Sequence, residues 1–460
     1  MNSWPYVKLA DVTTKVGSGA TPRGGKASYK ESGIPLIRSM NVHFDGFKYD
    51  GLAYLDDAQA RALDAVEVRA NDVLLNITGA SIGRVTVTPT RMDGARVNQH
   101  VCIIRPKPEL HPSFLRWYLA SPGQQKLIMD VQSGATRQAL TKEKILNLDV
   151  PAPPLSTQHQ VVEEIDKQFS RLDEAVASLN RVKANLKRYR AAVLKAAVEG
   201  RLVPTEAELA RREGRTYETG EQLLARYLKE HRAVRDEQVA RGCKTKCVET
   251  IRPGNSSLPK LPEGWVWVST EQVCSGVRDG THNTPAYVTK GVPLVTSKNL
   301  AETGIDFENV KLISEIDHSE ISRRSAVAPG DVLFAMIGTI GNPCVVTPSI
   351  PFSIKNVGLF KRSPETVLPQ FLCHWLTSAP FDGWLRPRLK GTTQKFAPLG
   401  LLRVIPLPLP PISEQRRIAT EVERRLSVVR NIENQVRENL GRASRVRQQV
   451  LTRAFSGKKV

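Results

Sequence analysis

The chain has 460 residues, of which 24% are charged, and a formal net charge of +20 at pH 7. This length allows two to four domains, and no apolar run approaches the ~20 residues of a membrane-spanning helix. The first residues lack the basic and apolar regions of a secretory signal, and six scattered cysteines fit a reducing compartment. We therefore expect a cytoplasmic protein whose basic excess meets a polyanion, with nucleic acid as the leading class.

The positive charge is unevenly distributed along the chain. Residues 1–155 carry +5 and residues 263–412 carry +2, whereas residues 413–460 carry +7. Solvated helix surface would account for much of this charge, so composition by itself does not assign a DNA-binding surface.

The chain contains two similar modules, offset by 257 residues over the best-matched stretch. FLRWYLAS at Phe114 is repeated as FLCHWLTS at Phe371, and GIPLIRSMNV at Gly33 is repeated as GVPLVTSKNL at Gly291. We predict two copies of one domain, at residues 1–155 and 263–412.

Each module has the pattern of a mixed α/β domain. Short apolar runs such as VLLNI, HVCIIRP, VLFAMI and NVGLFKR predict strands, and PSFLRWYLAS and PQFLCHWLTS predict helices. NPCV at Asn342 has the first two residues of the Asn-Pro-Pro-aromatic tetrad of adenine methyltransferases but lacks the others, and we interpret it as a turn. The predicted fold class is α+β, with two mixed α/β domains.

A long, charged, proline-free stretch follows each module, at residues 156–203 and 413–460. Apolar residues recur in both at alternating spacings of three and four, which predicts helical arms of about 45 residues, roughly 65 Å long. The predicted seams are Ile165, Gln168, Leu172, Ala175, Leu179, Val182, Leu186, Tyr189, Val193 and Ala196 in the first arm, and Val422, Arg425, Val429, Ile432, Val436, Asn439, Ala443, Val446 and Val450 in the second. Antiparallel pairing of the arms would give a pseudo-twofold dumbbell; the alternative is that each arm packs on its own domain. Gln168 and Arg425 are polar at matching seam positions, where they would loosen the coil or contact another subunit.

Residues 204–262 separate the first arm from the second module. Capping boxes at Thr205 to Glu208 and Thr219 to Gln222 predict helices. CKTKCVETIRPGNSSLPKLPEG then has the composition of a linker, in which Cys243 and Cys247 lack zinc-site spacing and are expected to be solvated.

Catalytic motifs are incomplete throughout the sequence. GSGATPRGGK has Gly25 where a P-loop requires lysine, and the eight histidines form no HExxH or paired metal-ligand spacing. We predict no catalytic residue and no metal site in this chain.

Polar loops recur at matching places in both modules. Arginine and lysine can donate to guanine, and asparagine and glutamine can bridge adenine, so matching frames with different tips would read different sequences. The predicted DNA-binding residues are Arg23, Lys26, Arg38, Ser39, Asn41, Arg137 and Gln138 in the first module and Thr281, His282, Asn283, Ser297, Lys298, Asn299, Gln394 and Lys395 in the second. The alternative is that these loops are turns in which Ser39, Ser297, Asn41 and Asn299 cap local backbone.

These residues resemble a known family, the specificity subunits of type I restriction-modification enzymes. The resemblance covers essentially the whole chain, and its carriers are the two GIPLIRSMN-like segments, the paired GAT and GTT loops, the PPLSTQ and PPISEQ junctions, and the arm endings LKAAVEGRL and LTRAFSG. It implies two target-recognition domains that read the halves of a split double-stranded DNA site, held apart by the arms. It also implies docking of two methyltransferase subunits, which bind S-adenosylmethionine, and of up to two restriction subunits, which use ATP and Mg²⁺.

Three hypotheses follow for the function. The favoured one is a non-catalytic subunit that reads DNA sequence. A self-contained methyltransferase or nuclease would need the cofactor and catalytic motifs that we did not find, and a coiled-coil protein scaffold would tolerate replacement of the loop tips.

Overall fold

The computed structural model describes residues 4–22, 24–130, 139–240, 258–301, 304–347 and 350–456, without the side chains of Lys26 and residues 232–240. Arg23, Arg137, Gln138, Cys243 and Cys247 lie outside the described residues. The chain forms two compact units, Met1–Val182 with Gln435–Val460, and Lys183–Asn434.

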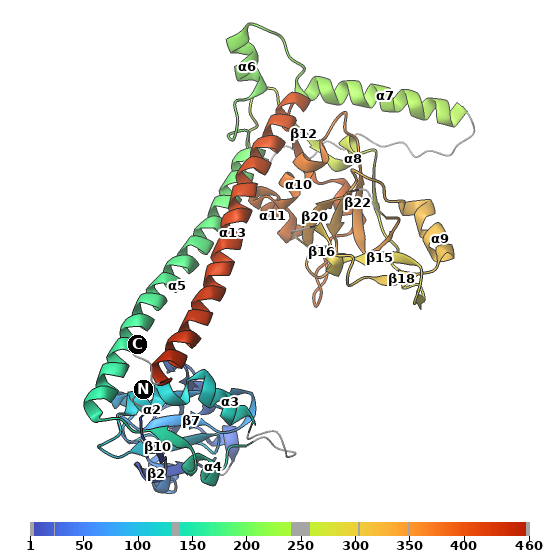
Figure 1. Cartoon of the computed structure of the whole chain (residues 1–460). Helices are drawn as coiled ribbons and strands as arrows, with labels where there is room; N and C mark the ends of the chain where they lie inside the picture. Colours follow the sequence, from blue (N-terminus) through green and yellow to red (C-terminus); the bar gives the residue numbers. More distant parts are fainter. Residues whose placement is uncertain are drawn as a thin grey trace. The chain divides into compact units, whose positions relative to one another are not determined.

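The first unit contains two sheets and two short strand pairs (Figure 1). The four-stranded antiparallel sheet has the order β2 (Thr13–Ser18), β10 (Val101–Pro106), β7 (Val73–Asn76) and β8 (Val85–Val87). The three-stranded sheet has the order β6 (Ala53–Leu55), β3 (Ile34–Ile37) and β9 (Arg96–Val97), with β3 and β9 parallel. The short pairs are β1 (Tyr6–Lys8) with β11 (Asp149–Pro151), and β4 (Val42–His43) with β5 (Gly46–Phe47).

The second unit repeats this topology, with one additional edge strand, β14, in its second sheet. Its first sheet has the order β13 (Gly276–Asp279), β22 (Val357–Lys361), β19 (Val332–Ala335) and β20 (Gly341–Val345). Its second sheet has the order β14 (Tyr287–Val288), β18 (Lys311–Ile313), β15 (Val292–Thr296) and β21 (Ser353–Lys355), again with one parallel pair, β15 with β21. The short pairs are β12 (Val266–Ser269) with β23 (Pro406–Leu409), and β16 (Leu300–Ala301) with β17 (Gly304–Ile305). The internal repeat predicted from the sequence is therefore confirmed in the fold.

Helices flank the sheets in both units. The first unit has α1 (Asp57–Arg61), α2 (Pro112–Leu119), α3 (Pro122–Asp130) and α4 (Lys142–Leu146), and the second has α8 (Thr270–Val273), α9 (Glu315–Ser325), α10 (Pro369–Thr377), α11 (Ala379–Leu385) and α12 (Leu399–Arg403). Phe114 on α2 and Phe371 on α10 are both fully buried in the main core cluster of their own unit. The FLRWYLAS and FLCHWLTS motifs recur because each supplies the helix that covers a sheet.

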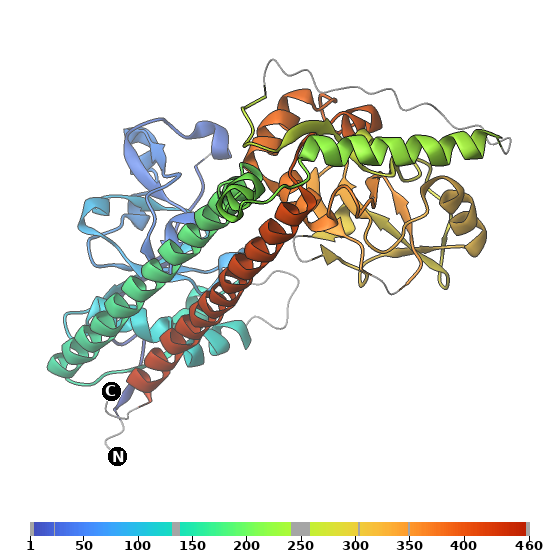
Figure 2. The ribbon, with the colours of Figure 1, turned by 90° about the horizontal axis from the view of Figure 1, so that it is seen from above.

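The two arms are the long helices α5 (Leu155–Val198) and α13 (Ile412–Phe455), of 44 residues each (Figure 2). In the first unit, Arg447 near the end of α13 pairs with Asp173 of α5, and its guanidinium lies 4.6 Å from the centre of the Phe169 ring. In the second unit, Val193 near the end of α5 shares a core cluster with Val422 near the start of α13. The start of each helix thus packs against the end of the other, as the predicted antiparallel pairing requires.

The predicted seam of α5 is buried at its ends and more exposed between them, whereas that of α13 also has buried residues near its middle. Six seam residues are buried, Ile165, Val193, Val422, Val429, Val436 and Val450. Nine are half-buried, Gln168, Leu172, Leu179, Leu186, Ala196, Arg425, Ile432, Ala443 and Val446. The seam prediction was wrong at four exposed residues, Ala175, Val182, Tyr189 and Asn439. The two polar seam residues bond within their own helices, Gln168 Nε2 to Glu164 Oε1 at 2.7 Å and Arg425 Nε to Glu421 Oε1 at 2.6 Å. Each of the two side chains therefore has a hydrogen-bond partner one turn earlier in its own helix.

The segment between the arm and the second module forms α6 (Glu206–Glu213) and α7 (Gly220–Ala240). Both predicted capping boxes are present: Thr205 with Glu208, and Thr219 with Gln222. The interpretation of Asn342–Val345 as a turn was wrong, because these residues belong to strand β20 and pair with β19. Asn342 has a φ of 44°, and its side chain donates to the Leu300 carbonyl at 2.9 Å, so a local left-handed residue is held within the strand. No described helix is both long and apolar enough to span a bilayer.

Candidate nucleic-acid interface

A close backbone crossing starts the first polar loop in each module. A Cβ added to Gly19 would lie 1.6 Å from the Val97 carbonyl oxygen, and one added to Gly280 would lie 2.2 Å from that of Ile354. Val97 ends β9 and Ile354 lies in β21, so the chain leaves the sheet that contains β2 or β13 and passes directly over the sheet that contains β9 or β21. Only glycine permits this crossing, and it places both first loops at the same point of the shared frame.

In the first module, this loop lies beside the turn between β9 and β10. The exposed Thr21 hydroxyl donates to Gln99 Oε1. The Gln99 Nε2 atom lies 3.0 Å from His100 Nε2, and His100 Nδ1 lies 2.5 Å from the Thr78 hydroxyl. A glutamine amide and an imidazole therefore stand in a row at one edge of the module. Both can hydrogen-bond a base edge.

In the second module, the equivalent place has different side chains. His282 lies between Asp279 Oδ2, 3.1 Å from its Nε2, and Asn356 Oδ1, 3.0 Å from its Nδ1. Asp279 is 4% exposed at its side chain and also pairs with Arg324, so a buried carboxylate orients the exposed imidazole. The neighbouring Lys355 ammonium donates to the Thr284 hydroxyl.

A third loop reaches the same edge in each module. Thr78 forms an isolated bridge with Ala139 in the first module, and Ile337 forms the matching bridge with Phe396 in the second. Backbone bonds between Lys390 and Phe396, at 2.8 and 3.0 Å, close the loop that presents Gln394 and Lys395 to solvent. The structure thus brings the predicted residues Thr281, His282, Asn283, Gln394 and Lys395 to one region of the second module.

The loop after β3 and β15 has a different role from the predicted one at its asparagines. Asn41 is fully buried, and its Nδ2 donates to the carbonyls of Lys48 at 2.9 Å and Asp50 at 3.2 Å. Asn299 is 5% exposed, and its Nδ2 donates to the Asn309 carbonyl at 3.3 Å. Both Oδ1 atoms accept from the backbone N–H three residues earlier, at 3.0 Å. The two amides hold the turn, as in the alternative considered from the sequence, and we leave them out of the candidate interface.

The other residues of this turn divide into structural and exposed ones. Ser297 is 7% exposed and donates to the Asn356 carbonyl at 3.0 Å, and the Ser39 carbonyl accepts from Asn76 Nδ2 at 2.9 Å. The half-buried Arg38 guanidinium lies 5.6 Å from the centre of the Tyr29 ring and donates to the Gly51 carbonyl. Lys298 is exposed and lies on the same turn, where it is available to a phosphate.

Four residues of this edge were missed in the sequence, namely Gln99, His100, Lys355 and Asn356. Gln99 and His100 follow β9 in VNQH, and Lys355 and Asn356 stand at the end of β21 in IKN, where two or three polar residues interrupt apolar runs. That interruption was the available signal, but its position beside the first loop depends on long-range strand pairing. Throughout the described part of the chain, no group of three His, Cys, Asp or Glu residues could hold a metal ion.

The chain has two copies of one α/β domain, each joined to a long helix, and the exposed polar side chains differ at matching loops. This arrangement is typical of proteins that present two recognition surfaces from one chain. Residues 1–188 match the family described as the type I restriction modification DNA specificity domain. Over nearly its whole length, the chain is similar to type I restriction-modification specificity subunits.

Similar proteins match over nearly the full length. The EcoBI specificity subunit of Escherichia coli is 26% identical over 99% of this chain and 86% of its own length, and the EcoKI specificity subunit of strain K12 is 20% identical over 99% and 89%. The HsdS subunit of Thermoanaerobacter tengcongensis has the same fold, with a TM-score of 0.53 at 18% identity over 100% of this chain and 98% of its own. A chain from a study of assembly and conformational transition of the type I R-M system aligns with a TM-score of 0.66 at 19% identity, over 100% of this chain and 99% of its own.

Proposed function

We propose that this chain is the non-catalytic subunit that gives a type I restriction-modification complex its DNA sequence specificity. Each module reads one half of a bipartite double-stranded target. The observation that carries this proposal is the difference between matching positions: Thr21, Gln99 and His100 in one module, and His282, Lys355 and Asn356 in the other. Two different half-sites can be read by one domain fold if the hydrogen-bonding side chains at matching positions differ.

The chemistry of the two edges favours DNA as the ligand. Amide, imidazole and ammonium groups can pair with base edges in the major groove, while Lys298 and Lys395 suit phosphate oxygens. The +20 net charge of the chain adds a long-range attraction that does not depend on sequence.

The arms supply the docking surface for partner subunits in this proposal. Val182 and Tyr189, at exposed seam positions of α5, and Val428 of α13 are 37%, 46% and 51% exposed. Apolar side chains in solvent on a long helix suit packing against helices of another chain. Two methyltransferase subunits would bring S-adenosylmethionine and the methylation of adenine, and restriction subunits would bring ATP and Mg²⁺. The chain itself supplies recognition and spacing.

Long-read mapping of DNA methylation tests the proposal. Cells that express this chain with its neighbouring methyltransferase subunit should gain N6-methyladenine in a split motif with a fixed spacer. Cells with the methyltransferase alone should lack that motif. The proposal fails if the two proteins co-purify but no split motif appears.

A further inference from the structure

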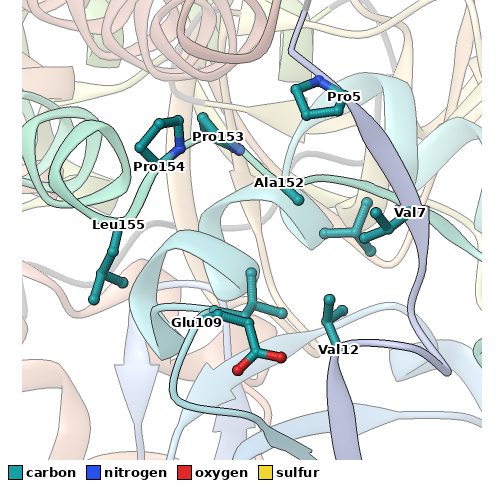
Figure 3. A pocket seen from close by; sticks show the side chains of 10 residues that line it. Pro5, Val7, Val12, Glu109, Ala152, Pro153, Pro154 and Leu155 are labelled. Atoms are coloured by element: carbon teal, nitrogen blue, oxygen red, sulfur yellow. The ribbon is translucent and has the colours of Figure 1, made fainter.

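An apolar groove crosses the first unit beside the start of the α5 arm. It has a volume of about 450 Å³ (Figure 3). Its walls come from β1, from β11 and the residues after it, and from the first turn of α5, and they include Val7, Val12, Leu110, Val150, Pro154 and Leu155. A second cavity of about 380 Å³ shares Leu110 and Leu155 with it and extends the groove toward Arg69, Lys107 and His159.

The equivalent surface of the second unit is filled by helix α7. Leu223 of α7 is fully buried there, in one core cluster with Val273, Val367 and Leu409. These three residues are the repeat equivalents of Val12, Leu110 and Ala152, all of which line the groove of the first unit. The side chain that covers them in one module therefore has no counterpart among the described residues of the other.

The start of α7 lies very close to the backbone of the second module. Gly220 N–H donates to the Gly264 carbonyl at 2.7 Å, and a Cβ on Gly220 would lie 2.3 Å from the Leu409 carbonyl oxygen. Two turns later, Tyr227 is 6% exposed and lies beside Ser363, on the stretch equivalent to Pro106–Pro108. Gly220 thus lies at the equivalent of the first cavity, and Tyr227 lies at the equivalent of the second. Helix α7 therefore runs in the same direction as the groove that the two cavities form.

The first residues of the two arm helices also differ in exposure between the modules. Leu155 is 41% exposed, whereas its repeat equivalent Ile412 is half-buried and packs against the core cluster that contains Leu223. Ile412 is therefore partly covered in the second unit, whose groove is filled by α7. Leu155 is exposed in the first unit, whose groove is open.

We propose that a helix of the methyltransferase subunit docks in the groove of the first unit, in the position that α7 occupies in the second. This inference rests on the proposed function, which supplies that partner. The docked face would carry a small residue at its start, a leucine one turn later and an aromatic residue after a further turn, as Gly220, Leu223 and Tyr227 do.

The basic residues at the second cavity indicate which groups the C-terminal end of the docked helix would carry. Arg69 is exposed at the second cavity, and Lys107 is half-buried there. Such cations stabilise the carbonyl end of a helix, and a carboxylate near that end could pair with them. A second copy of this chain is a poorer occupant, because the first turns of its α7 are already buried in its own second unit.

A photo-cross-linking residue at position 155 tests the occupant in the assembled complex. Illumination should join this chain to one helix of the methyltransferase subunit with the predicted pattern of apolar residues. A product with α7 of a second copy, or no product from a complex shown to be assembled, would overturn the inference.

A pair of charged substitutions tests the contribution of the groove to assembly. L155E should weaken binding of the purified methyltransferase subunit at least tenfold by biolayer interferometry. I316E, at an apolar residue of α9 that is 80% exposed, should change it less than twofold. Equal affinities for L155E and the unchanged chain would overturn the inference while leaving the proposed function intact, whereas failure of the unchanged chain to bind the methyltransferase subunit would count against both.

Discussion

Gln158 and Gln415 hold equivalent places in the two modules and make the same set of three hydrogen bonds. The Gln158 Oε1 atom accepts from the His111 N–H at 2.7 Å, and its Nε2 donates to the carbonyls of Glu109 and Pro153, both at 2.9 Å. Gln415 does the same with Leu368, Thr366 and Pro410, at 2.9, 2.9 and 3.0 Å. Both side chains are almost completely buried. The final glutamine of the PPLSTQ and PPISEQ motifs therefore fastens each arm to its recognition domain.

Replacing this glutamine should destabilise the first unit. Q158A leaves one N–H and two carbonyls, all partly or fully buried, without this partner, and we expect a loss of about 2–4 kcal/mol in the free energy of unfolding. Urea denaturation measures it. The exposed neighbour substitution Q160A should stay within about 0.5 kcal/mol, as surface changes usually do, and equal losses for the two variants would contradict this role.

Stability should depend on pH through Glu414, whose carboxylate accepts from Trp265 Nε1 at 3.0 Å and from the Glu206 N–H at 2.9 Å. Burial raises its pKa from 4.5 to about 7. The unfolded chain releases this proton near pH 4.5 while the folded protein keeps it until about pH 7, so the free energy of unfolding falls as the pH rises through that interval.

The urea midpoint at pH 5 and pH 8 measures the Glu414 effect. The fall between the two values should be smaller in E414Q than in the unchanged chain, because glutamine has no proton to release. E438Q, at an exposed position of the same helix, should keep the full fall. A fall of the same size in E414Q would show that Glu414 does not titrate in this range.

Two substitutions in the second module should separate base recognition from phosphate contact. H282A should reduce affinity for the mapped target by about 1–3 kcal/mol and have little effect on a duplex with that half-site scrambled. K298A should weaken binding to both duplexes and lower the slope of log affinity against log salt by about 1. Fluorescence anisotropy of the assembled complex gives both quantities, and a uniform loss for H282A would exclude a base contact.

The length of the arms should set the spacer of the target. Seven residues inserted into both α5 and α13, between 182 and 183 and between 434 and 435, keep the seam continuous. The insertion adds roughly 10 Å at ~1.5 Å per residue, or about three base pairs at ~3.4 Å each. Methylation mapping should show the same two half-sites with a longer spacer, and an unchanged spacer would contradict the role of the arms.

The sequence by itself determined the features that depend on local pattern. The predicted strand runs, the PSFLRWYLAS and PQFLCHWLTS helices, both long helices and the capping boxes at Thr205 and Thr219 follow from spacings within one short segment, and the 257-residue repeat follows from comparing one segment with another. Such spacings reflect hydrogen bonds between residues a few positions apart, so they can be read without the fold.

The tertiary structure alone decided which polar side chains are free to bind. Asn41 and Asn299 stand in loops that suit base recognition, yet burial and bonds to backbone carbonyls up to ten residues away commit them to the turn. Gln99 and Lys355 were missed because strand pairing within each module brings them beside residues far away in the sequence. Gln99 lies beside Thr21, 78 positions away, and Lys355 lies beside Thr284, 71 positions away. The open groove of the first unit likewise appears only when the path of α7 over the second is known. In each case the outcome depends on the burial of a side chain by residues distant in sequence, which no local pattern encodes.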